Sequence, residues 1–121
     1  MRAEHGSAVV EFALVVPLVI AVLFAGVEVT VLARTQLELT AAAREAAREA
    51  ATSPEPSRAV IAAQSSLGPR LGPKVRVTAS RPAEVGKPAV VTLALPHRLA
   101  APLLGGWTVE LRARAVMRIE R

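Results

Sequence analysis

Apolar residues dominate the beginning of the chain. Residues 12–27 are sixteen consecutive uncharged positions, FALVVPLVIAVLFAGV, and the residues on either side are also largely apolar. Between residues 7 and 33 only Glu11 and Glu28 carry a charge. This stretch exceeds the ~20 residues that a helix needs to cross a bilayer. We therefore expect a transmembrane helix over residues 7–33.

Strong helix formers continue the pattern beyond the predicted span. There is no Gly or Pro from Val27 to Thr52, and Arg-Glu pairs recur with a four-residue step at positions 44–45 and 48–49. Six alanines leave a narrow surface that a neighbouring element can approach closely, at positions 42, 43, 46, 47, 50 and 51. We expect a helical extension over residues 34–53, and a Pro-rich break at 54–57 because proline removes a backbone donor.

The spacing of apolar residues changes after the break. Residues 58–67, RAVIAAQSSL, predict a short helix that Ser57 caps and Gly68-Pro69 ends. Three later segments have the apolar patterns of strands: KVRVTAS, AVVTLAL and WTVELRARAVMRIE at 74–80, 89–95 and 107–120. About three such strands form a small antiparallel sheet whose apolar face needs a cover, which either predicted helix can provide. The fold class is therefore α+β, with residues 58–121 as a small domain outside the membrane.

Charge is unevenly distributed along the chain. From residue 58 onward there are eleven Lys or Arg residues and three Glu residues, whereas residues 1–57 are slightly acidic. Arg112, Arg114 and Arg118 share the polar face of the last predicted strand. That face also carries Glu110, and no aromatic platform for stacking bases accompanies it. We expect a solvated basic face and no nucleic-acid partner.

No pattern of catalytic or metal-binding residues stands out. The chain has no cysteine, and its two histidines, His5 and His97, lack metal-ligand partners at helical or hairpin spacing. There is also no phosphate-binding loop and no motif that places a nucleophile beside a base. We expect no enzyme, no cofactor or metal, and no small-molecule substrate.

A carboxylate near the start of the apolar stretch requires an explanation. Glu11 lies in GSAVVEFALVVP at residues 6–17, and a charge at the centre of a membrane helix costs about 2.5–3.5 kcal/mol on insertion scales. Either Glu11 lies in the headgroup region, or a cation of a neighbouring chain neutralises it.

The N-terminal segment closely resembles the TadE-like family of pseudopilins, accessory subunits of the tight-adherence (Tad/Flp) branch of type IV pili. The resemblance lies in GSAVVEFALVVPLVIAVLFAGVEV at 6–29 and LELTAAAREAAREAA at 37–51. It implies a leader, residues 1–6, that a prepilin peptidase removes by cutting between Gly6 and Ser7. It also implies that Glu11, which Phe12 follows, meets the new Ser7 amine of an adjacent subunit during assembly.

Three further residues have two interpretations each. Pro17 removes a backbone hydrogen bond and favours a kink, and in pilin-type helices such loosening can also help extraction into a filament. Glu28, near the outer boundary, either lies in the interface or pairs with a basic residue of another subunit. Trp107 either marks a membrane interface or begins a strand after Gly105-Gly106.

The resemblance implies an assembly subunit of a Tad pilus or a related secretion machinery. Its N-terminus would face the cytoplasm, and residues from Arg34 onward would lie outside the membrane. Its partners would be the membrane, the prepilin peptidase, other pilin or pseudopilin subunits and the Tad assembly platform. The alternative is a secreted or membrane-anchored binding module with no pilus role, held by an ordinary signal or signal-anchor. Positive charge ahead of the apolar stretch is low, since Glu4 offsets Arg2, which disfavours a secretory signal.

Overall fold

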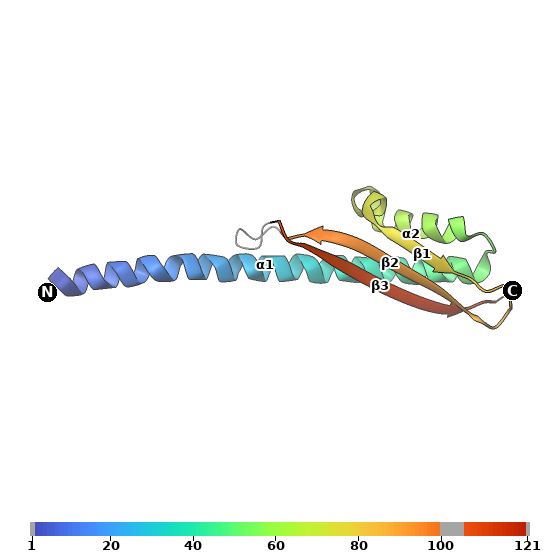
Figure 1. The fold of residues 1–121 in the computed structure, drawn as a ribbon, viewed down its shortest axis with the longest axis horizontal. Coiled ribbons are helices and arrows are strands. Elements are labelled where there is room, and N and C mark those ends of the chain that lie inside the picture. The colour runs from blue at the N-terminus through green and yellow to red at the C-terminus, as the bar shows by residue number, and fades with distance from the viewer. Residues whose placement is uncertain (1, 100–105, 121) are drawn as a thin grey trace.

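The computed structural model describes residues 2–99 and 106–120. One long helix carries a smaller helix and a three-stranded antiparallel sheet along its C-terminal half (Figure 1). In chain order the elements are α1 (Arg2–Thr52), α2 (Pro56–Leu71), the 3₁₀ helix η1 (Gly72–Lys74), β1 (Arg76–Ser80), β2 (Pro88–Arg98) and β3 (Thr108–Arg118). The α+β class predicted from the sequence is confirmed.

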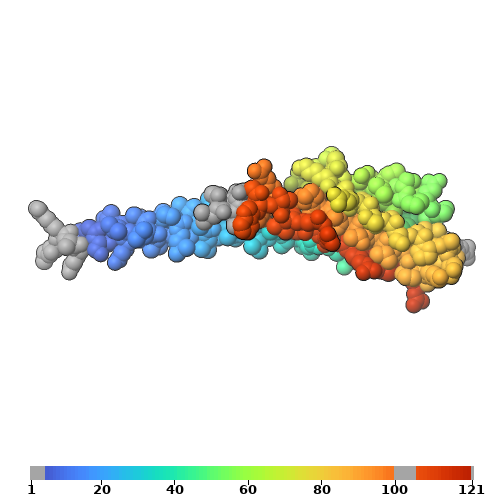
Figure 2. Space-filling view, viewed as in Figure 1, coloured from blue at the N-terminus to red at the C-terminus, as the bar shows by residue number. Residues whose placement is uncertain are grey.

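The two halves of α1 have different surroundings. The N-terminal half is apolar, and none of its most apolar part is buried within the chain. Phe12, Leu18 and Phe24 are all exposed there. From Glu28 onward other elements cover one face of the helix. Figure 2 shows the uncovered half as a narrow extension from the bulkier part of the molecule. By length and composition, α1 is able to cross a membrane.

Alanines line the covered half of α1. All six alanines at positions 42, 43, 46, 47, 50 and 51 are buried, as are Ala59 and Ala63 of α2. The distance between two packed helices depends on the side chains at their contact, and alanine allows a close approach. The narrow surface noted in the sequence is therefore occupied within the chain itself, by α2 and by the sheet.

α2 begins at a different residue from the one expected. Its N-cap is Glu55, which makes no capping hydrogen bond through its side chain. The prediction that Ser57 caps this helix is wrong, because Pro56 opens the helix, where its fixed φ and missing N–H cost nothing. The interruption expected at Gly68 is present, since Gly68 leaves the helical conformation with a φ of 79°. One further turn then runs to Leu71.

The sheet has the strand order β1-β2-β3, and both neighbouring pairs are antiparallel. Its inner face is apolar: the register aligns Val77 of β1, Leu93 of β2 and Ala113 of β3 in one row. Leu93 is fully buried, and Val91 and Leu95 on the same face are buried with it. α1 covers β2 and β3, whereas α2 contacts β1. Both helices therefore contribute to the cover that the sequence called for.

The outer face of the sheet is polar and basic. The register places Arg76 and Arg112 on either side of Ala94, and Arg114 lies in the next row. All three arginines are exposed. Arg112 pairs with Glu110, with 2.6 Å between Nε and Oε1. The alternation of the last strand into an inner apolar and an outer charged face is confirmed.

Residues beyond the strands close the C-terminal end of α1. Arg81 Nε donates a hydrogen bond to the Ala50 carbonyl at 2.7 Å, and the Glu120 N–H donates to the Ala51 carbonyl at 3.3 Å. The last carbonyls of a helix have no partner inside it. These two bonds satisfy such groups and fix one end of the sheet to the end of α1.

Candidate membrane and assembly region

The predicted processing site lies in the first turns of α1. Gly6 and Ser7 are both helical and exposed. A Cβ atom added to Gly6 would meet no other heavy atom within 4 Å. Packing within the chain therefore does not require glycine at this position. Any strict need for Gly6 has to come from a partner.

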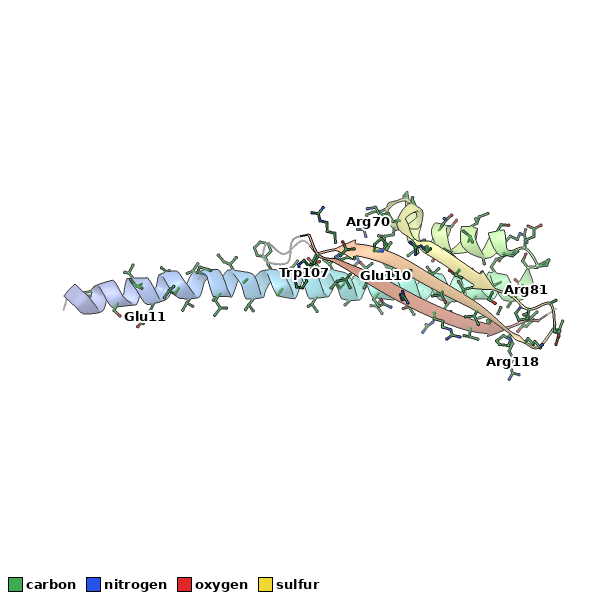
Figure 3. The ribbon with its side chains drawn as sticks, viewed as in Figure 1. Glu11, Arg70, Arg81, Trp107, Glu110 and Arg118 are labelled. Carbon is green, nitrogen blue, oxygen red and sulfur yellow. The ribbon has the colours of Figure 1, made fainter. Side chains whose placement is uncertain are left out.

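Glu11 follows Ser7 by one helical turn on the same face of α1, because residues i and i+4 are neighbours on a helix. The Glu11 side chain is exposed and points away from the rest of the chain (Figure 3). The adjoining Phe12 is exposed as well. Both side chains are thus accessible to lipid or to a second chain.

Pro17 lies inside α1 without ending it. The helix runs as one element from Arg2 to Thr52, although a proline nitrogen has no hydrogen to donate to the carbonyl four residues earlier. The local melting that proline favours is absent from this conformation. A role for Pro17 in helix extraction stays a prediction.

Glu28 lies against the sheet, with only 9% of its surface exposed. His97 of β2 is its partner, with 2.9 Å between His97 Nε2 and Glu28 Oε1. An ionised carboxylate only accepts hydrogen bonds, so a bond to Glu28 in that form requires the His97 tautomer that carries its proton on Nε2. Neither interpretation drawn from the sequence included this partner within the chain, and an interfacial position for Glu28 stays a prediction.

Sequence reasoning missed His97, although a signal for it exists. His97 continues the inward-facing positions of β2 after Leu93 and Leu95, and a polar group turned toward a core normally has a hydrogen-bond partner. However, 69 positions separate Glu28 from His97. The two residues meet only because β2 lies at that height along α1.

Comparison with known protein families gives a match over the N-terminal part of the chain. Residues 6–48 fit the family model described as TadE-like protein. The chain carries a TadE-like segment. No curated protein and no solved structure matches the chain significantly.

The TadE-like match confirms the resemblance noted in the sequence. It contains all of the processing and assembly residues proposed above, and it ends within the covered half of α1. α2 and the sheet lie outside it.

TadE-like proteins form a structural, non-enzymatic family. Among the described residues, no group of three or more His, Asp or Glu side chains is arranged to hold a metal ion. The TadE-like segment and the exposed apolar helix fit a membrane-anchored protein.

Proposed function

We propose that this chain is a minor pilin or pseudopilin that takes part in assembling a Tad (Flp) type IV pilus or a related secretion machinery. The observation that carries the proposal is the TadE-like match over residues 6–48. It falls on a helix whose apolar half is left uncovered by its own chain. A bare apolar helix needs lipid or other helices around it, and an assembly subunit uses both in turn.

The arrangement in the membrane follows from where the sheet begins to cover α1. The sequence predicts a span over residues 7–33, but α1 is partly covered from Glu28 onward, so we place the end of the span there. Residues 7–27 span about 31 Å at 1.5 Å per residue, close to the ~30 Å thickness of the hydrocarbon core. Glu28 would then lie at the outer boundary. The N-terminus would face the cytoplasm, and the sheet, α2 and the covered half of α1 would lie on the other side.

Maturation would remove residues 1–6 by cleavage between Gly6 and Ser7. The new α-amine of Ser7 is a cation at the membrane face, and Glu11 of an adjacent subunit would neutralise it as the helices pack together. The exposure of Glu11 supports this role, because its carboxylate is accessible to another chain. Phe12 and Pro17 would contribute to the same helix-to-helix contacts, with Pro17 loosening the helix when it leaves the bilayer.

The mass of the mature protein, recovered from native envelopes, tests this proposal. Loss of MRAEHG with the apolar helix retained is the expected result. Loss of about twenty-five residues would indicate a secretory signal, and an intact chain would indicate a plain anchor. Either of those outcomes would favour the alternative, an extracytoplasmic binding module without a pilus role.

A further inference from the structure

The end of the β2–β3 hairpin nearest the apolar half of α1 carries an exposed tryptophan. Trp107 is the only tryptophan in the chain, and 66% of its surface is exposed. Its carbonyl accepts a hydrogen bond from the Leu99 N–H at 2.9 Å, so Trp107 lies opposite Leu99 at this end of the hairpin. Figure 3 shows Trp107 beside the middle of α1, far from the end where Arg81 lies.

The contact between His97 and Glu28 fixes the height of Trp107 along α1. Leu99 lies two residues beyond His97, which moves the chain at most about 7 Å toward the N-terminal half of α1. One helical turn, about 5.4 Å, leads from Glu28 back to Phe24. Trp107 therefore lies level with the last turn of the uncovered apolar half, where Phe24 and Val27 are exposed.

We propose that Trp107 and Arg98 make a second membrane contact, with the Trp107 ring in the headgroup region of the leaflet that α1 leaves at Glu28. Tryptophan is enriched at membrane–water interfaces because its ring is apolar and its indole N–H remains hydrated. Arg98, exposed at the same end of the sheet and opposite Thr108 in the register, supplies a cation for lipid phosphates.

This second contact depends on the proposed anchoring of the chain by α1 and adds an orientation to it. A single spanning helix tilts and rotates freely in a bilayer unless flanking residues restrain it. A lipid contact by the hairpin, to one side of the helix axis, would restrain both motions. The folded part would then present its basic outer face in one defined direction.

Fluorescence of the full-length protein in lipid nanodiscs tests the proposal. The chain has one tryptophan and no tyrosine, so its emission reports on Trp107 alone. We expect emission shifted to shorter wavelength, strong quenching by lipids brominated near the headgroup end of their acyl chains, and little quenching by acrylamide in the water.

A matched variant moves the tryptophan to the opposite end of the sheet. Val85 lies between β1 and β2 and is 67% exposed, almost the same as Trp107. The double variant W107F/V85W should emit at longer wavelength, resist the brominated lipids and be quenched by acrylamide. The same emission and quenching in the two proteins would overturn the lipid contact. Full quenching of Trp107 by acrylamide would also overturn it, and would leave the ring available to contact another subunit. Failure of the protein to enter nanodiscs would instead contradict the membrane anchoring on which the proposed function depends.

Discussion

Glu28 of α1 and His97 of β2 meet at 2.9 Å, at the level where the sheet stops covering the long helix. Their side chains are largely withdrawn from solvent, with 11% and 21% exposed. The pair joins the two parts of the molecule that have different surroundings: the bare apolar helix and the folded region outside it. It holds the end of the sheet nearest the apolar half of α1, as Arg81 holds the opposite end.

Loss of this contact should destabilise the sheet. His97→Leu removes one hydrogen bond to the Glu28 carboxylate, and a hydrogen bond to a charged group contributes about 1.5–3 kcal/mol. For a folded region of this size we expect the unfolding midpoint to fall by about 4 °C or more. Thermal unfolding in detergent, followed by Trp107 fluorescence, measures the change.

The exposed pair Arg34–Glu38 provides the control. Its Nε and Oε1 atoms are 3.3 Å apart on the surface of α1, and exposed pairs of this spacing contribute at most about 0.5 kcal/mol. Glu38→Gln should therefore leave the midpoint almost unchanged. Equal losses from His97→Leu and Glu38→Gln would contradict the special role given to the Glu28 contact.

The alanine surface of α1 should not tolerate larger side chains. Ala46 is fully buried, and Ala46→Leu would push neighbouring elements away from α1 at a cost of about 1–3 kcal/mol. Ala41→Leu makes the same change on the exposed face of the same helix and should cost almost nothing. Denaturant unfolding of both variants decides the question, and similar midpoints would argue against close packing.

The backbone conformation of Gly72 does not require glycine, since its φ of −52° suits any residue. The requirement comes from the close approach of the Gln64 backbone. A Cβ atom at this position would lie 2.6 Å from the Gln64 carbonyl oxygen. Gly72→Ala should therefore separate η1 from α2 and lower the stability of the folded region by about 1–3 kcal/mol. Gly26→Ala meets no heavy atom within 4 Å and should leave that stability unchanged. A neutral Gly72→Ala variant would show that the chain can relax around this contact.

Maturation and assembly should respond to different residues. Gly6→Leu should block removal of the leader without disturbing the helix, since the position has free space around it. Glu11→Ala should spare cleavage but weaken assembly, because the Ser7 amine of a neighbouring subunit loses its counter-charge. Glu45→Ala, which removes an exposed carboxylate outside the apolar half, should alter neither. Intact mass reports cleavage, and pilus or secretion output reports assembly. Normal output from both the Gly6 and Glu11 variants would count against the scheme.

Local patterns in the sequence predicted the elements and their faces. Alternation in the last strand assigned Ala113 to the core and Arg112 to the outer face, because side chains of a strand alternate by geometry. The length of the apolar run predicted the part of α1 that the rest of the chain leaves uncovered. The Ser57 cap failed because two local signals competed, and a proline at the start of α2 prevailed over a serine.

Contacts between distant parts of the chain could not be predicted. Gln36 donates from α1 to the Arg112 carbonyl across 76 positions, at 2.8 Å, and the Glu28–His97 contact spans almost as many. Both depend on the height at which the sheet lies along the helix, which no local spacing encodes. The candidate processing residues, in contrast, lie close together in one motif, so the sequence alone can propose them, and their role stays a prediction.

α1 continues as one helix from its uncovered apolar half into the folded region, so the two halves turn together. Each residue added between Val27 and Glu28 would leave the Glu28–His97 contact intact. It would turn everything beyond it by about 100° and raise it by about 1.5 Å. The number of residues in α1 therefore sets the direction in which the arginine-bearing surface points relative to the apolar half. A one-residue insertion would change that direction and leave every helix and strand in place.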